Sequence, residues 1–172
     1  MAIAKGELVG HFIDGQTQVF REEAFLHMLN REAARAIRYQ DYFTVCLLRP
    51  DSPRDTWRVS EDIERAVSEK VPEFVRATDL VGQLSSAIAV ILLHTVGEDA
   101  LRVADRIRAN IEQVAFRERG QSAPQRLTVS VGQVSFPHDG HDHAALLSQA
   151  MAFLEQATRG GGNQVRDRGR LD

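Results

Sequence analysis

Hydrophobic residues recur along this chain with two spacings, one typical of helices and one typical of strands. Residues 21–39 carry apolar side chains at the spacing of a single helical face, which predicts a first helix. Those positions are Ala24, Phe25, Met28, Leu29, Ala33 and Ile37. The run 43–48 that follows is continuously apolar and ends before two prolines, so it predicts a buried strand.

The middle of the chain predicts a second helix and then a hairpin. Ser60, followed by two acidic residues, is typical of a helix start, and Pro72 is expected to tighten the last turn of that helix. Its apolar face is formed by Val59, Ile63, Val67, Val71 and Phe74. The runs 80–84 and 87–93 are separated by Ser85-Ser86, which is the spacing of two strands in a hairpin.

The last third predicts two more helices around one strand. Residues 98–116 form an amphipathic pattern, residues 127–131 alternate apolar and polar, and residues 143–158 form a final helix. Three glycines at 160–162 end that helix, and residues 163–165 are expected to add an edge strand. The resulting order, α-β-α-β-β-α-β-α-β, predicts one mixed sheet with helices packed against it.

Composition narrows the classes of protein that fit this pattern. A chain of 172 residues suits one domain, and a formal charge of −3, from 21 basic and 24 acidic residues, argues against a nucleic-acid or anionic membrane surface. The longest continuous apolar run, 87–93, is far too short to span a bilayer, and no secretory signal opens the chain. A single cysteine excludes an internal disulfide, so we expect a soluble cytoplasmic protein.

Five segments in the right order resemble the GGDEF family. Residues 76–93 resemble its RxxD motif, five-residue spacer, signature and following strand. Residues 127–132 (LTVSVG) resemble its "TVSIG" strand, and residues 146–163 resemble its closing "AK..GRN" segment. Asp14, Thr17 and the run 24–26 resemble its opening motif, and 103–108 (VADRIR) resembles its "vAerIR" helix.

The resemblance implies an α/β (α+β) fold, the nucleotide-cyclase palm, which is a ferredoxin-like mixed sheet flanked by helices. It covers residues 12–165, so we expect an N-terminal lead at 1–11 and a flexible tail at 166–172. Active members are diguanylate cyclases, which join two GTP molecules into cyclic di-GMP across a dimer. Their chemistry needs divalent metal held by carboxylates and glycines close to the nucleotide.

The signature positions of this chain depart from the family pattern. They read Ser85, Ser86, Ala87, Ile88 and Ala89, so both glycines and both acids are missing. The second metal-binding aspartate of the family aligns with Arg49, which would repel a cation placed about 4 Å away by a few kcal/mol.

The surrounding residues do not compensate for these losses. Asp51 remains nearby, but one carboxylate beside an arginine does not make a magnesium site. The family's guanine-holding stretch after the first strand is also missing. We therefore predict a catalytically inactive domain with no Mg²⁺ and no other cofactor.

A second family site is retained. Cyclases of the family bind their product, cyclic di-GMP, at the RxxD motif and an arginine of the following helix; these positions are Arg76, Asp79 and Arg106 here. Arginine forks suit phosphate or the guanine Hoogsteen edge, and a carboxylate can accept two hydrogen bonds from guanine. The structural alternative is that Arg76 serves a helix C-terminus, Asp79 pairs with it, and Arg106 is simply solvated.

Other candidates favour structural roles. His138, Asp139, His141, Asp142 and His143 could supply metal ligands, but Asp142 or His143 is better explained as the start of the last helix. Cys46, in an apolar strand, is expected to be an inert core thiol. Trp57 lies in the segment after Pro50, which is shorter than the family's, and is expected to have a packing role. The arginines of the tail are expected to be solvated.

We therefore expect a cyclic di-GMP receptor or adaptor that signals through a protein partner in trans, because almost nothing precedes the domain in this sequence. A ligand-bridged homodimer is a further implication of the resemblance. The alternatives are an interaction scaffold that has lost all ligand binding, and a metal-free enzyme that uses Arg49 and the Ser85-Ser86 turn.

Overall fold

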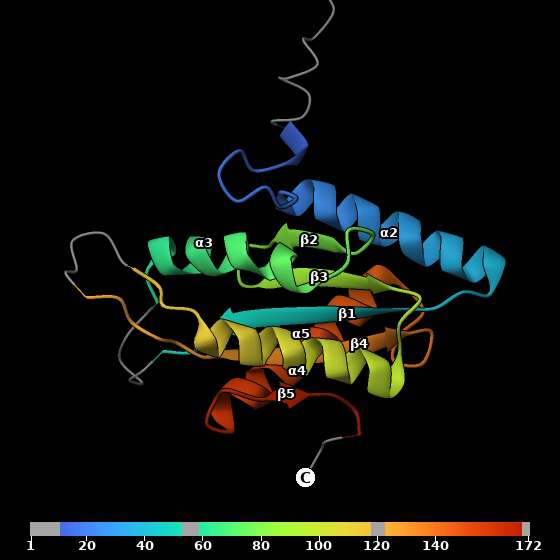
Figure 1. The fold of residues 1–172 in the computed structure, drawn as a ribbon. Helices are drawn as coiled ribbons and strands as arrows, with labels where there is room; N and C mark the ends of the chain where they lie inside the picture. The colour runs from blue at the N-terminus through green and yellow to red at the C-terminus, as the bar shows by residue number, and fades with distance from the viewer. Residues whose placement is uncertain (1–10, 53–58, 118–122, 170–172) are drawn as a thin grey trace, which may run out of the picture.

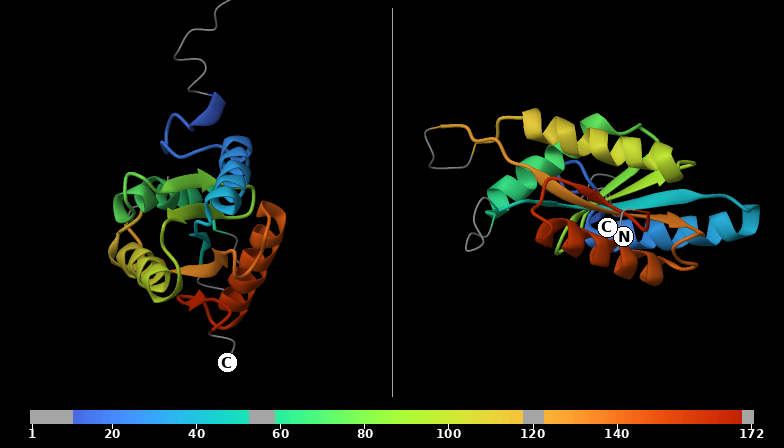
Figure 2. Two further views of the ribbon diagram at one scale, coloured as in Figure 1. Left: turned by 90° about the vertical axis from the view of Figure 1, so that its right-hand side faces the viewer. Right: turned by 90° about the horizontal axis from the view of Figure 1, so that it is seen from below.

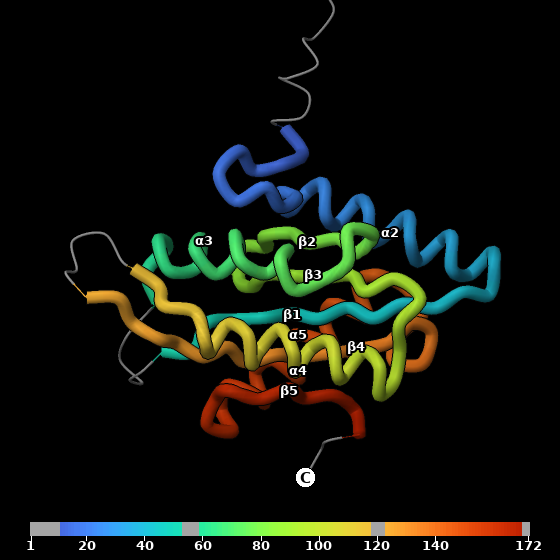
Figure 3. The backbone as a smooth tube through the Cα atoms, viewed as in Figure 1, coloured from blue at the N-terminus to red at the C-terminus, as the bar shows by residue number. Residues whose placement is uncertain are grey.

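The computed structural model describes residues 11–52, 59–117 and 123–169. Its elements, in chain order, are α2 (Glu22–Tyr39), β1 (Phe43–Pro50), α3 (Glu61–Lys70), the 3₁₀ turn η1 (Val71–Phe74), β2 (Leu80–Gln83), β3 (Ile88–Leu93), α4 (Gly97–Gln113), β4 (Val129–Phe136), α5 (His143–Arg159) and β5 (Val165–Arg166). This order is the one that the hydrophobic pattern predicts (Figures 1 and 3).

Five strands form one mixed sheet in the order β2-β3-β1-β4-β5. The pairs among β2, β3, β1 and β4 are antiparallel, and the pair of β4 with β5 is parallel. Strand β1 lies in the centre and pairs along its whole length with β4, from Phe43 opposite Phe136 to Pro50 opposite Val129. The predicted mixed sheet of the cyclase palm is confirmed.

Helices cover both faces of the sheet, as the right-hand view of Figure 2 shows. On one face, α3 and α4 cover a core that includes Cys46, Leu48 and Ile107. On the other face, α2 and α5 cover a core that includes Phe25, Leu47 and Phe153. Since side chains alternate along a strand, β1 contributes its even-numbered residues to the first core and its odd-numbered residues to the second.

Local sequence signals explain where the helices begin and end. The hydroxyl of Ser60 accepts a hydrogen bond from the backbone N–H of Ile63 and caps α3, and Asp142 caps α5 in the same way. Helix α2 has Glu22 and Glu23 in its first turn, where negative charge is stabilised by the helix dipole, and ends at Gln40 in the left-handed conformation.

Several boundaries differ from the prediction, and two of the differences have a clear physical reason. Strand β4 runs to Phe136 instead of ending at residue 131, because pairing with β1 carries the polar residues Gln133 and Ser135 into the sheet. Arg166 belongs to β5, and Nε of Arg168 lies 3.2 Å from a carboxylate oxygen of Asp139, so the expected flexible tail begins inside the sheet. Pairing of a short edge strand overrides the polar composition of this segment.

Candidate functional site

The signature residues lie in the tight turn between β2 and β3 and in the first part of β3. The backbone N–H of Leu84 donates to the carbonyl of Ala87 at 2.8 Å and closes the turn. Ser85 and Ser86 are exposed, whereas Ala87, Ile88 and Ala89 are buried. Ala87 and Ile88, which the resemblance aligns with the two acidic positions of the family signature, thus belong to the hydrophobic core.

Arg49 reaches this turn from the end of β1. Its Nε donates to the carbonyl oxygen of Ser86 at 3.2 Å, and its Nη1 lies 3.0 Å from Oε1 of Glu155 on α5. Nη2 also contacts the sulfur of Met151 at 3.6 Å. The guanidinium group therefore connects β1, the signature turn and α5, and it brings a fixed positive charge to the place where the resemblance puts a metal-binding carboxylate.

Glu22 occupies the other side of the same turn. Its Oε2 accepts a hydrogen bond of 2.8 Å from the backbone N–H of Ser85. A backbone amide in a turn is a good donor to an anion, and here the chain's own carboxylate takes that position. The contacts of Glu22 and Glu155 could not be predicted from the sequence. An acid in the first turn of a helix is expected from the helix dipole, and an acid on an exposed helical face is expected from its solvation.

Asp51 has a structural role at the end of β1. Its carboxylate accepts hydrogen bonds from the hydroxyls of Thr128 (2.7 Å) and Ser130 (2.6 Å) and from the backbone N–H of Asn163 (2.8 Å). These bonds join β1, β4 and the segment before β5. The carboxylate that the sequence analysis considers as a lone metal ligand is therefore already engaged by three donors.

A cavity of about 390 Å³ lies between the start of α2, the first turns of α3 and the end of β2. Desolvation raises the pKa of Glu64 above its ordinary value, the nearby Glu61 raises it further, and Arg49 acts in the opposite direction. The lining residues are Asp14, Thr17, Arg21, Glu22, Glu61, Glu64, Arg65 and Gln83. This acidic lining is unsuited to triphosphate unless cations accompany it.

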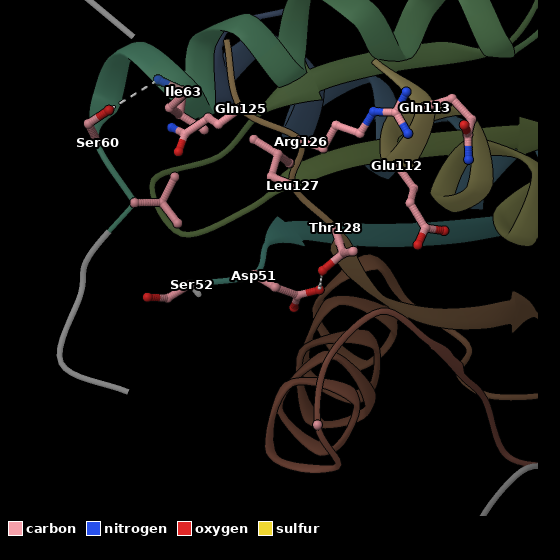
Figure 4. A pocket seen from close by; sticks show the side chains of 12 residues that line it. Asp51, Ser52, Ser60, Ile63, Glu112, Gln113, Gln125, Arg126, Leu127 and Thr128 are labelled. Atoms are coloured by element: carbon pink, nitrogen blue, oxygen red, sulfur yellow. Dashed lines mark hydrogen bonds between the residues drawn. The ribbon is translucent and has the colours of Figure 1, made fainter. Parts of the chain in front are cut away.

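A second cavity, of about 530 Å³, lies just beyond the end of β1 and is lined there by Asp51 and Ser52 (Figure 4). It is bounded by the start of α3, the end of α4 and the segment 125–128 that leads into β4. Asp51 and Thr128 face one another at its base, joined by the hydrogen bond drawn in Figure 4. Asp51, the acidic side chain at this base, is thus already engaged with Thr128.

The three residues of the expected cyclic di-GMP site lie on neighbouring elements. Arg106, on α4, donates from Nη2 to the carbonyl of Phe74 at 3.0 Å, two residues before Arg76. The carboxylate of Asp79 accepts from the backbone N–H groups of Arg76 (2.9 Å) and Leu93 (3.2 Å). Arg76 and Arg106 are exposed and Asp79 is half-buried. Part of the structural alternative also holds, since Asp79 orders this turn, although it does so through backbone and not through the Arg76 guanidinium.

The remaining sequence candidates have structural surroundings. Burial raises the pKa of the Cys46 thiol to about 12, with a smaller contribution from Asp79, so this core thiol is unreactive at neutral pH. Asp142 caps α5 by accepting from the N–H of Ala145 at 2.8 Å, as predicted. Trp57 lies outside the described residues.

The described residues contain neither a cluster of metal ligands nor a membrane-spanning helix. Within them, no three His, Cys, Asp or Glu side chains gather closely enough to hold a metal ion. None of the helices in the same ranges has the length and hydrophobicity needed to cross a membrane.

Comparison with known proteins agrees with this architecture. Residues 11–164 match the family model described as diguanylate cyclase, GGDEF domain. The chain belongs to the GGDEF family. Among curated GGDEF relatives, the probable diguanylate cyclase DgcT of Escherichia coli (strain K12) is 25% identical over 158 residues, covering 88% of this chain and 34% of DgcT. The chain therefore spans about a third of that relative's length.

Solved GGDEF domains share the fold. The coiled coil and GGDEF domain of DgcB from Caulobacter crescentus, solved in complex with c-di-GMP, has a TM-score of 0.77 at 22% identity, covering 92% of this chain and 87% of that one. The diguanylate cyclase SiaD of Pseudomonas aeruginosa, solved with its activator SiaC, has a TM-score of 0.77 at 22% identity, covering 94% of this chain and 64% of that one.

Proposed function

We propose that this GGDEF domain is a cyclic di-GMP receptor that carries out no turnover and transmits binding to a partner protein. The ligand would bind at Arg76, Asp79 and Arg106. The observation that carries the proposal is the contact of Arg106 with the carbonyl of Phe74, because it holds the α4 arginine beside the turn that presents Arg76 and Asp79.

The chemistry of these three side chains suits a cyclic dinucleotide. Two guanidinium groups offer forked donors to phosphate or to guanine. Each oxygen of Asp79 accepts one backbone N–H and keeps further lone-pair capacity that can accept from a guanine edge. With good bidentate contacts worth about 1–3 kcal/mol each, three residues are sufficient for micromolar binding.

Relatives support both parts of this proposal. The DgcB domain was solved in complex with c-di-GMP, and SiaD was solved with a protein activator. Proteins that contain a GGDEF domain can therefore have a dinucleotide or a protein as partner, and we assign the same two kinds of partner to this chain.

The charges around the signature turn support the proposed lack of turnover. The residues present do not fit magnesium: a guanidinium lies where a carboxylate ligand is needed, Ala87 has no oxygen to offer, and Asp51 is engaged by three donors. Phosphoryl transfer depends on cations to neutralise the developing charge. We therefore propose that the domain neither holds the metal nor makes cyclic di-GMP.

Isothermal titration with cyclic di-GMP tests the receptor role. We expect the wild type to bind with a dissociation constant of about 1–50 µM, and Arg76→Ala and Arg106→Ala to bind at least about tenfold more weakly. Arg102→Ala is the matched control, since Arg102 lies one turn earlier on α4 and pairs only with Glu98 and Asp99 in the described contacts. Absence of heat from the wild type at 100 µM ligand, or equal binding by Arg76→Ala, would refute the proposal.

A scaffold without any ligand is the second candidate. It is favoured by one observation, namely that both oxygens of Asp79 already accept backbone hydrogen bonds, as in an ordinary structural turn. This candidate predicts that a partner binds wild type and Arg76→Ala equally, with and without cyclic di-GMP.

A further inference from the structure

A third cavity, of about 440 Å³, lies at the end of the sheet where β1 begins and β4 ends. The signature turn lies at the other end of β1. Arg76, Asp79 and Arg106 are not among the residues that line this cavity. Its lining includes Tyr42, Val96, Gln133, Ser135, Pro137 and Asp139. Its volume is in the range of sites that hold small molecules.

The floor of this cavity contains an unsatisfied hydrogen-bond acceptor. Gln133 is 2% exposed, and its Oε1 has no hydrogen-bond partner among the described residues. Gln133 and Ser135 are two positions apart on β4, so their side chains project to the same face, and both line the cavity. A buried amide oxygen without a partner costs about 1–3 kcal/mol, so a ligand that donates to it would recover a substantial free energy.

The hydroxyl of Ser135 can also only accept a hydrogen bond from a ligand. The hydroxyl of Thr44 has one proton, which it donates to the carbonyl of Thr95 at 2.7 Å. The hydrogen bond of 2.9 Å between the hydroxyls of Thr44 and Ser135 must therefore use the proton of Ser135. Ser135 consequently has only lone pairs left to offer, and the cavity floor presents two acceptors and no free hydroxyl donor.

The walls and rim add apolar surface and a carboxylate. Tyr42, Val96 and Pro137 supply ring and aliphatic surface. Asp139 at the rim has a side chain only 7% exposed; it accepts from the N–H of Ser135 (2.8 Å), and its other oxygen lies 3.0 Å from His138 and 3.2 Å from Arg168. A flat, uncharged molecule with N–H donors matches this combination better than an anion does.

We propose that this cavity is a binding site for an amino-substituted heteroaromatic ring of nucleobase size, whose N–H groups donate to Gln133 and Ser135 while its faces pack against Tyr42 and Val96. Binding requires a small rotation of the Gln133 amide toward the cavity, because its oxygen is covered in the unliganded domain. The site is independent of the proposed cyclic di-GMP site, and either can be refuted without the other.

Titration with free adenine, followed by chemical shifts of the ¹⁵N-labelled chain, tests this inference. We expect adenine to shift the amide signals of residues 133–139 and 96–97, with a dissociation constant of about 0.1–5 mM for so small a ligand. Purine, which lacks the amino group, should bind more weakly. Gln133→Leu should weaken adenine binding about five- to tenfold and should fold normally, because it removes an unpaired acceptor.

Two controls make the result decisive. Gln113→Leu changes a glutamine in a different cavity and should bind adenine as the wild type does. Ser135→Ala should weaken binding without changing the site of the shifts. No shifts at 5 mM adenine, shifts confined to other residues, or equal binding by Gln133→Leu and wild type would each overturn the proposal.

Discussion

At the residue scale, Arg49 is the side chain that joins the signature turn to two neighbouring elements. Its guanidinium connects β1 to the signature turn and to Glu155. We expect Arg49→Ala to lower the free energy of unfolding by about 1 kcal/mol, measured by urea denaturation, because a half-buried hydrogen bond and ion pair are lost. Arg159→Ala is the control: Arg159 lies 3.9 Å from the same glutamate and is 82% exposed, so its removal should change stability little. Equal effects of the two changes would contradict the role given to Arg49.

Asp79 combines a proposed ligand role with a structural one. Asp79→Ala removes the acceptor for two backbone N–H groups and should destabilise the domain by about 1–3 kcal/mol. Thermal unfolding beside Asp105→Ala, a change at an exposed acid in the middle of α4, measures this effect. If Asp79→Ala is as stable as the control, the turn is held by other contacts. This structural role is the reason for choosing arginine variants in the binding experiment.

At the scale of elements, the close approach of α5 to β4 depends on Gly132. A Cβ added at Gly132 would collide with the backbone of Ala150 and Leu154 on α5. Gly132→Ala should therefore cost about 2–4 kcal/mol, because neither backbone can move without disturbing the core. Gly15→Ala, at a position with open space, is the matched control and should be nearly neutral. A melting temperature of Gly132→Ala equal to that of the control would show that α5 can shift.

The connection between α2 and β1 should be sensitive to acid. The pKa of Asp41 is lowered, mainly because its carboxylate accepts a hydrogen bond from the backbone N–H of Tyr42. Desolvation acts in the opposite direction, and the side chain of Arg35 lowers the pKa further. The pKa of this carboxyl is therefore lower in the folded than in the unfolded protein. Such a carboxyl contributes fully to the stability of the folded protein at a pH above its ordinary pKa of about 4, and this contribution is lost as the pH falls through the folded pKa. Asp41→Asn should thus cost roughly 1–2 kcal/mol at pH 7, and the difference from wild type should shrink as the pH falls below the ordinary aspartate pKa of about 4. A difference independent of pH would contradict this assignment.

The order of elements was predictable because apolar periodicity is a local property of the sequence. Helix α2 and strands β2 and β3 are confirmed almost residue by residue. Strand β4 was predicted too short, since Gln133 and Ser135 interrupt the alternation and only the long pairing with β1 places them in the sheet. Helix α4 ends at Gln113, three residues before the end that was predicted.

The candidate site was less predictable than the fold. The sequence identifies which signature residues are missing, but it does not show that Arg49 contacts residues 37 and 106 positions away. Contacts of this range depend on the packing of the whole domain. The same reason explains why Glu22 and Gln133 were missed: each is unremarkable in its own helix or strand and acquires a meaning only from its neighbours across the fold.

At the scale of the whole molecule, the domain combines an intact cyclase fold with charges unsuited to metal at the end of its central strand. The three proposed ligand residues lie on or beside η1, β2 and α4, at the opposite end of β2 from the signature turn. Loss of catalysis and retention of ligand binding can therefore occur together. A variant that impairs one is not expected to impair the other.

The central claim is that Arg49 and Ala87 leave no place for the metal on which turnover depends, and a turnover assay tests it most directly. Purified protein at 10 µM would be incubated with 1 mM GTP and 10 mM MgCl₂ overnight, and cyclic di-GMP would be quantified by mass spectrometry beside an active cyclase. The account predicts no product above the background of heat-denatured protein. Product that requires Mg²⁺ and disappears in Asp51→Asn would contradict it.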